Sequence, residues 1–224
     1  MFKLFSKKKR SKDQVFLECE LPVGVIDRIG ETEFKSQSSY SSSRQQKVAR
    51  LANRLFKDSD FKGTEVLEFG PGHFGFSLYA RARGASVTAF EYDATFAAIG
   101  RDLDLRVIEN DFCFNDFSSM PKPNIIFAKG VFNAYRYDEQ QFDLIKRNWY
   151  EIFDSASKVF FTTVNKGADD SLLEERLEMA QNLFLSLGCS EVDISEDIRR
   201  LYALNYTGVH IWVKGLEINN LVNY

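Results

Sequence analysis

Cysteine, proline and histidine are scarce in this chain of 224 residues, and long apolar runs are missing. The three cysteines, Cys19, Cys113 and Cys189, are widely separated and form no Cys-x-x-Cys pair. Their spacing argues against a disulfide framework or a zinc site and fits a reducing compartment. No apolar run approaches the roughly 18–20 residues that a membrane span needs. The basic start is not followed by the apolar stretch of a secretory signal, so we expect a cytoplasmic protein.

An excess of one charge is also lacking, because 29 Lys and Arg residues face 32 Asp and Glu residues. The net charge of −3 gives no global basic surface, and we expect no nucleic-acid partner. Hydrophobic residues make up 44% of the chain, which excludes a disordered protein. The length allows one sizeable core. We expect one domain over residues 63–224, preceded by an extension over residues 15–62 and a flexible tail over residues 1–14.

The tail combines a short apolar tip, which holds Phe2, Leu4 and Phe5, with the basic cluster Lys7–Arg10. Such a segment can touch an anionic membrane surface weakly, which would make the protein peripheral to a membrane. It can equally be a solvated tail without a partner. The apolar tip is too short to anchor the chain alone, so both interpretations stay open.

The extension contains a serine-rich loop over residues 36–43, followed by a helical pattern. Ser43 and Gln46 have the spacing of a capping box. The apolar residues that follow repeat at helical intervals: Val48, Leu51, Ala52, Leu55 and Phe56. We expect this helix to pack against the main domain.

From residue 63 onward, apolar strand patterns alternate with helical patterns. The strand patterns cover residues 65–69, 86–90, 106–108, 124–128, 158–164, 190–194 and 208–214. The helical patterns cover residues 75–83, 94–100, 138–153 and 170–187. Such alternation predicts an α/β fold whose parallel sheet carries helices on both faces. The last two strand patterns have no full helix between them.

A glycine-rich turn follows the first strand pattern, where residues 68–75 read Glu-Phe-Gly-Pro-Gly-His-Phe-Gly. Gly70, Gly72 and Gly75 allow a tight turn and a close approach of a ligand to the backbone. This spacing alone is a weak signal, because many nucleotide-binding folds share it. Glu68 adds information, since a carboxylate at the strand tip would oppose the anionic pyrophosphate of a dinucleotide. It suits a cofactor that carries positive charge and no phosphate.

Acidic residues also stand at the tips of the next two strands. Glu91 follows Gly70 by 21 positions, a place from which a carboxylate can accept both hydroxyls of a ribose. Asp111 and Phe112 follow the third strand, where an acid and an aromatic ring suit the amino group and the face of an adenine. A phosphate-free cation that contains adenine and ribose is S-adenosylmethionine.

On these motifs the chain resembles the class I, Rossmann-like, S-adenosylmethionine-dependent methyltransferases, over roughly Gly63 to Gly215. The resemblance implies a three-layer sandwich with a mostly parallel seven-stranded sheet and an antiparallel last strand. It implies S-adenosylmethionine as cofactor. The cofactor-binding residues expected from it are Glu68, Gly70, Gly72, Glu91, Tyr92, Asp111, Phe112 and Lys129. A nicotinamide dehydrogenase is disfavoured by Glu68 and by the 69 residues that precede Gly70.

The methyl acceptor is less defined. Weak catalytic candidates are His73 in the glycine turn, Tyr135 after the fourth strand, and Tyr40, because N-terminal additions in this family often line the substrate pocket. Each can also be structural, and His210 fits a structural histidine on the last strand. The Asp/Asn-Pro-Pro-aromatic motif of amine-directed nucleic-acid enzymes is absent, and Lys129 stands where a metal-binding acid would be expected.

We therefore expect metal-independent transfer of a methyl group to a hydroxyl, carboxyl or amine of a small molecule or glycan. A protein or RNA methyltransferase and a non-catalytic binding protein with the same fold are the alternatives.

Overall fold

The structure is a computed structural model and describes residues 42–164, 173–202, 204, 209–218 and 221. Its strands are β1 (Glu65–Phe69), β2 (Ser86–Glu91), β3 (Arg106–Glu109), β4 (Ile125–Asn133), β5 (Lys158–Val164), β6 (Ser190–Val192) and β7 (His210–Lys214). The α-helices are α3 (Ser42–Leu55), α4 (Gly75–Arg81), α5 (Ala94–Asp102), α6 (Glu139–Ser155), α7 (Leu173–Ser186) and α8 (Glu196–Leu201). Two short 3-10 helices, η1 (Asp58–Asp60) and η2 (Ala134–Arg136), complete the elements. The tail, Tyr40 and residues 36–41 of the serine-rich loop lie outside the described residues. Ser42 and Ser43 already belong to α3, so the predicted capping position of Ser43 is wrong.

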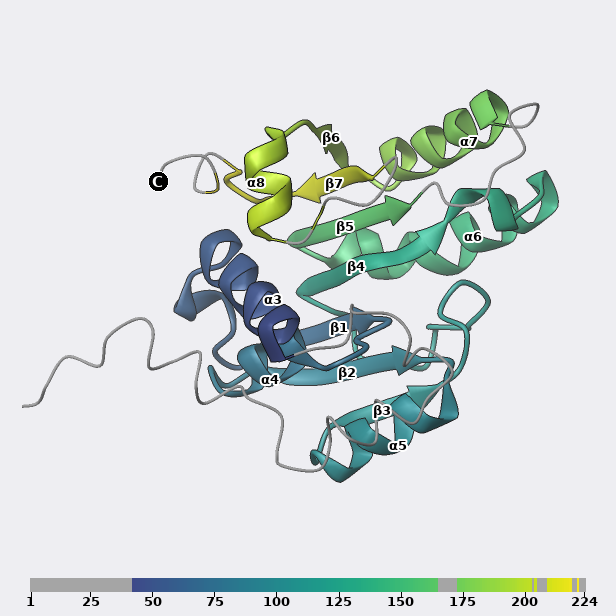
Figure 1. The fold of residues 1–224 in the computed structure, drawn as a ribbon. Coiled ribbons are helices and arrows are strands. Elements are labelled where there is room, and N and C mark those ends of the chain that lie inside the picture. Colours follow the sequence, from purple (N-terminus) through teal and green to yellow (C-terminus); the bar gives the residue numbers. More distant parts are fainter. Residues whose placement is uncertain (1–41, 165–172, 203, 205–208, 219–220, 222–224) are drawn as a thin grey trace, which may run out of the picture.

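The strands form one seven-stranded sheet in the order β3-β2-β1-β4-β5-β7-β6 (Figure 1). The pairs β3·β2, β2·β1, β1·β4 and β4·β5 are parallel, while β7 is antiparallel to both β5 and β6. The expected mostly parallel sheet of seven strands with an antiparallel β7 is confirmed. Chain order reverses at β1 and β4, so the carboxyl ends of these two strands flank the place where such sheets bind ligands.

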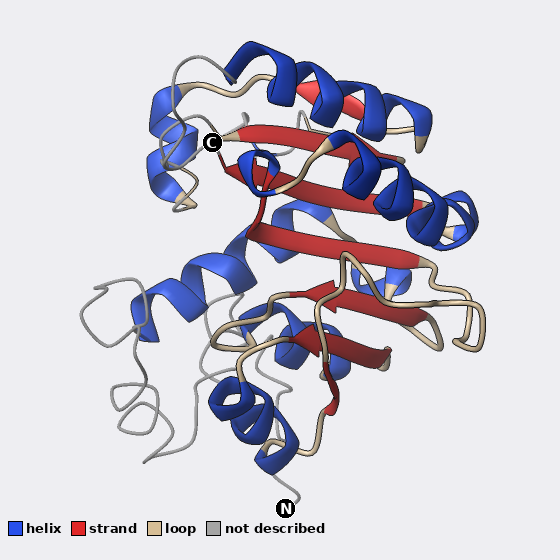
Figure 2. Cartoon of the chain, turned by 90° about the vertical axis from the view of Figure 1, so that its right-hand side faces the viewer, coloured by secondary structure: helices blue, strands red, loops and turns tan. Residues whose placement is uncertain are grey.

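Helices cover both faces of the sheet and create two separate cores (Figures 1 and 2). On one face, buried side chains of α3, α4 and α5 pack against residues such as Phe127 and Phe160. On the other face, α6 and α7 bury Trp149 and Phe184 against Phe69 and Phe161. The α3 helix confirms the apolar pattern from Val48 to Phe56, whose members are all buried. The three-layer sandwich is therefore as expected.

Local signals explain where several helices begin. The Asp93 carboxylate accepts the amide protons of Thr95 and Phe96 and so caps α5. Asp138 and Gln141 form a reciprocal capping box at the start of α6. Short polar side chains at these positions satisfy amide groups that have no partner within the first turn of a helix.

The fourth strand is longer than the sequence pattern indicates, since it continues past Ala128 to Asn133. Its register with β5 shifts between Lys129 and Phe132. Gly130 has a φ of 73° there, and its amide donates to the Thr162 hydroxyl oxygen at 2.7 Å. The irregular segment 129–131, called here the β4 bulge, displaces the backbone at the carboxyl end of β4.

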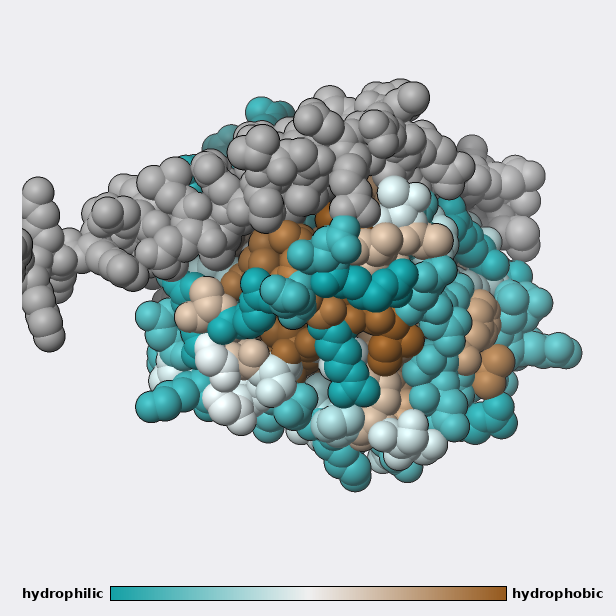
Figure 3. All heavy atoms as spheres, turned by 90° about the horizontal axis from the view of Figure 1, so that it is seen from below, coloured by the Kyte–Doolittle hydropathy of each residue, from teal (hydrophilic) through white to brown (hydrophobic). Residues whose placement is uncertain are grey.

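The β3 edge of the sheet is short and carries charged residues at its ends, Arg106 and Glu109. Seen from this side, hydrophobic side chains gather near the centre of the surface between hydrophilic ones (Figure 3). Charges on a short edge strand discourage pairing with another chain.

Among the described helices, none is both long and apolar enough to cross a membrane.

Candidate active site

The first predicted site residue, Glu68, lies near the end of β1 with only 3% of its surface exposed. Its carboxyl group accepts a hydrogen bond from the Ser77 hydroxyl in α4 and another from the Ser77 backbone amide. Burial raises the pKa of Glu68 to about 8, although these two bonds lower it. The nearby Glu91 charge adds a smaller increase. Glu68 therefore binds a proton readily until a cation or further donors stabilise its charge.

The second, Glu91, ends β2 and is also buried, with 5% of its surface exposed. Its carboxyl group accepts the amide proton of Asp93 at 3.1 Å and that of Gly72 in the glycine turn. Burial raises the pKa of Glu91 to about 7, although these hydrogen bonds lower it. Glu91 thus ties β2 to the glycine turn and places a second carboxyl group of raised pKa beside Glu68.

The glycine turn itself is shaped by packing. Gly70 and Gly72 have φ values of 58° and 55°, which favour glycine. A Cβ atom on Gly70 would lie 2.2 Å from Cγ1 of Val131 in the β4 bulge. The close approach at Gly70 is therefore made by a side chain of the protein. Phe74 also has a positive φ, 56°, and precedes α4 without a side-chain cap.

The residues predicted for the adenine differ from one another in exposure. The Tyr92 side chain follows Glu91 and is 61% exposed. Asp111 is half-buried, and its carboxylate accepts the Cys113 amide proton at 2.9 Å. The Phe112 ring lies in the core, stacked on Phe69 with centroids 4.7 Å apart. Because packing accounts for Phe112, the exposed ring of Tyr92 is the better placed of the two to meet a ligand, and the adenine contact of either stays a prediction.

The acceptor-side candidates His73 and Tyr135 lie on the glycine turn and after β4, and Lys129, predicted as a cofactor contact, lies within β4. His73 is buried in the turn, with 8% of its surface exposed. Lys129 is half-buried in the β4 bulge, and Tyr135 is half-buried in η2. Cys113 and Tyr137 are in contact nearby, 3.2 Å between Sγ and Oη, and burial raises the pKa of both groups. Both therefore stay neutral, and neither is an activated nucleophile.

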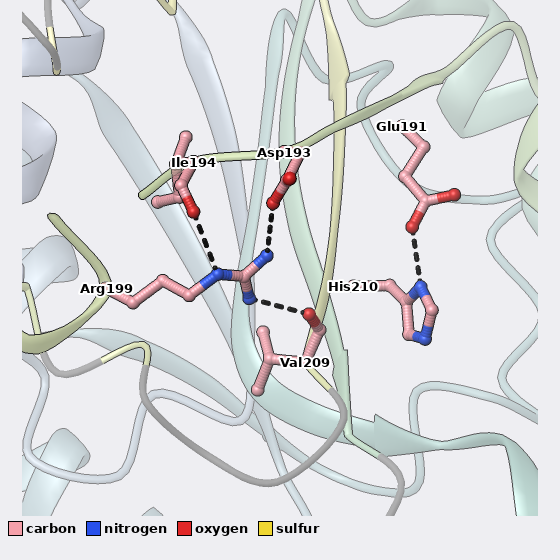
Figure 4. Close-up of polar contacts among 6 residues, drawn as sticks. All are labelled: Glu191, Asp193, Ile194, Arg199, Val209 and His210. Atoms are coloured by element: carbon pink, nitrogen blue, oxygen red, sulfur yellow. Dashed lines mark hydrogen bonds and ion pairs between the residues drawn. The ribbon is translucent and has the colours of Figure 1, made fainter. Parts of the chain in front are cut away.

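His210 lies at the same edge of the sheet, because it begins β7 and pairs with Thr163 near the end of β5. Its Nδ1 atom lies 2.5 Å from Oε1 of Glu191 on β6 (Figure 4). Beside this pair, Arg199 of α8 donates to the carbonyl oxygens of Ile194 and Val209 and to the Asp193 carboxylate. These contacts tie α8 to both ends of the β6–β7 connection.

Two participants could not be predicted from the sequence pattern. Ser77 is recognisable only as a hydroxyl in the first turn after the glycines, and nothing in the sequence pairs it with Glu68. Glu191 has no sequence signal as a partner of His210, because their contact depends on the β6–β7 register. Within the described part of the chain, no three His, Cys, Asp or Glu side chains are placed to hold a metal ion.

Comparisons with known proteins support the fold. No protein-family model and no curated protein sequence matches the chain. Among solved structures, magnesium protoporphyrin IX methyltransferase (ChlM) from Synechocystis, with bound S-adenosylmethionine, is similar with a TM-score of 0.51 at 12% identity, covering 90% of this chain and 97% of that one. A TehB-like S-adenosylmethionine-dependent methyltransferase from Corynebacterium glutamicum gives 0.50 at 15% identity, covering 76% and 88%.

At such identities the likeness concerns the fold. It agrees with the seven-stranded sheet and its antiparallel β7. The chain has the fold of the class I, Rossmann-like methyltransferases.

Proposed function

We propose that the protein is an S-adenosylmethionine-dependent methyltransferase. The observation that carries this proposal is the pair of buried carboxyl groups, Glu68 and Glu91, at the tips of neighbouring strands beside a glycine turn. Uncompensated burial raises both pKa values, so a ligand that brings positive charge and hydroxyl donors would complete the site. An anionic pyrophosphate would meet two acids instead.

In this proposal, the residues at the carboxyl ends of the strands contact different parts of the cofactor. Glu91 would accept the ribose hydroxyls, Asp111 the adenine amino group, and Tyr92 would lie against the adenine ring. Glu68 would supply negative charge for the cationic part of the cofactor. When bound, this cofactor supplies an electrophilic methyl group on a sulfonium that leaves readily. The protein then has to align the acceptor and exclude water.

For the acceptor, we propose a hydroxyl, carboxyl or amine of a small molecule or glycan, without a metal. A hydroxyl acceptor must also lose a proton, and His73 and Tyr135 are the candidates for that task.

Calorimetric titration with S-adenosylmethionine, its demethylated product S-adenosylhomocysteine, and NAD tests the cofactor. We expect both adenosyl ligands to bind and NAD not to bind. Glu91→Ala should weaken both adenosyl ligands by about tenfold or more, because a buried contact to the ribose is lost. Ser155→Ala, at the far end of α6, is the control. Binding of NAD alone would contradict the proposal, and binding that is unaffected by Glu91→Ala would remove the ribose assignment.

A further inference from the structure

Ser77 contributes two different hydrogen bonds to one carboxyl group. Its backbone amide and its hydroxyl both donate to Glu68, and Ser77 is fully buried. The hydrogen bond from the backbone amide links the start of α4 to β1, and it forms whatever side chain stands at position 77. The hydrogen bond from the hydroxyl group forms only when this residue is serine. A substitution that removes only the hydroxyl therefore separates the structural contact from the electrostatic one.

Few groups besides Ser77 influence the charge of Glu68. From β2, Glu91 acts against ionisation because it carries the same charge. His73 in the glycine turn, Lys129 in the β4 bulge, and Tyr79 and Arg81 in α4 are further ionisable side chains on the neighbouring segments. In the described structure, Ser77 provides both of the hydrogen bonds that stabilise the ionised form of Glu68.

A hydroxyl that donates to a buried carboxylate favours its charged form. Hydrogen bonds to charged groups contribute about 1.5–3 kcal/mol, and 1.4 kcal/mol corresponds to a tenfold change in affinity. Without the hydroxyl, Glu68 should hold its proton to higher pH, and its attraction for a cation should weaken at neutral pH.

We propose that Ser77 is a positioning residue whose hydroxyl stabilises the ionised form of Glu68 when this carboxyl group pairs with a cationic cofactor. The inference rests on the proposed function. It adds a residue of α4 that would touch no part of the cofactor and act on its affinity through Glu68 alone.

The experiment measures the affinity of S-adenosylmethionine by calorimetry from pH 6 to 9.5 for wild type, Ser77→Ala and the control Ser155→Ala. Like Ser77→Ala, the control removes one serine hydroxyl that donates within the protein, there to backbone carbonyl oxygens. We expect Ser77→Ala to bind about tenfold more weakly than wild type at pH 7. The ratio of the two affinities should fall toward one by about pH 9.5, where Glu68 ionises in both proteins.

A double-mutant cycle tests the route of the effect. In a Glu68→Gln background, Ser77→Ala should change the affinity by less than about twofold, because no ionising partner remains. If Ser77→Ala does not fold, Ser77→Cys takes its place, since the thiol has a similar size and is a weaker donor. It should give a smaller shift in the same direction.

The outcomes are distinguishable. A wild-type protein that binds no S-adenosylmethionine at any pH overturns the proposed function, and this inference with it. Wild-type binding combined with a Ser77→Ala loss that is equal at every pH, or with no loss, overturns the role of Ser77 alone. An undiminished effect in the Glu68→Gln background does the same.

Discussion

At the scale of single residues, two opposing effects set the state of the site. Burial favours neutral carboxyl groups at Glu68 and Glu91, while donors from Ser77, Gly72 and Asp93 favour charged ones. Burial prevails, so the pKa values of both acids are raised. The position of these acids at strand tips could be predicted from the sequence, because the strands have regular apolar patterns. Their hydrogen-bond donors could not, since they depend on the tertiary packing of α4 and the turn.

Glu68→Gln should change the pH dependence of stability in the ligand-free protein. The folded-state pKa of about 8 lies above the ordinary value of 4.5, so folded Glu68 retains a proton that the unfolded chain loses. Its contribution to stability is therefore present at low pH and is lost as pH rises from about 4.5 to about 8. Glutamine does not titrate. The variant should gain stability relative to wild type across this window, by at most about 1.4 kcal/mol per pH unit.

Urea unfolding of both proteins between pH 5 and 9 measures this difference. A free-energy difference that stays constant over the range would show that Glu68 is not buried in a neutral state.

At the scale of elements, the β4 bulge is the feature that the sequence pattern did not predict. The apolar run up to Ala128 indicated a strand, but Lys129 and Gly130 looked like its end. Pairing resumes at Phe132 and Asn133, because Thr162 accepts the Gly130 amide and the Phe132 ring is buried in the core. Helices were easier to predict, since α5 and α6 carry both a periodic apolar face and a capping side chain.

The contact between the bulge and the glycine turn predicts the effect of Gly70→Ala. Alanine at a φ of 58° is strained, and its Cβ would lie 2.2 Å from Val131 Cγ1. We expect a loss of about 2–5 kcal/mol, from roughly 1–2 for the backbone and about 1–3 for overpacking. Thermal or urea unfolding measures it.

Gly63→Ala is the matched control, because Gly63 has a φ of 69° and an added Cβ there would meet nothing within 4 Å. It should show the backbone cost alone. Adding Val131→Ala to Gly70→Ala should relieve the overpacking and bring the loss attributable to position 70 back toward the backbone cost that Gly63→Ala shows. Equal losses for Gly70→Ala and Gly63→Ala would mean that Val131 does not pack against the turn.

At the scale of the whole molecule, the sheet separates two cores and brings the candidate site residues to one edge. The alternation of strand and helix patterns was sufficient to predict the layers, because a parallel strand needs a crossover that covers a face. The pairing of β7 between β5 and β6 brings His210 and Glu191 to the edge that also holds Glu68 and Glu91, but on the opposite face of the sheet. Sequence patterns predict the half of this edge near β1 and β2. The half near β5 and β7 depends on strand register, so only the folded structure shows which side chains meet there.

The central claim is that a cationic cofactor binds against Glu68 at this edge, and proton linkage tests it most directly. Calorimetry with S-adenosylmethionine at pH 7, in two buffers of different ionisation enthalpy, counts the protons that binding releases or takes up. Wild type should release up to about one proton more than Glu68→Gln, because the bound cation ionises a carboxyl group that is otherwise protonated. Equal proton counts for the two proteins, or no binding to wild type, would contradict the account.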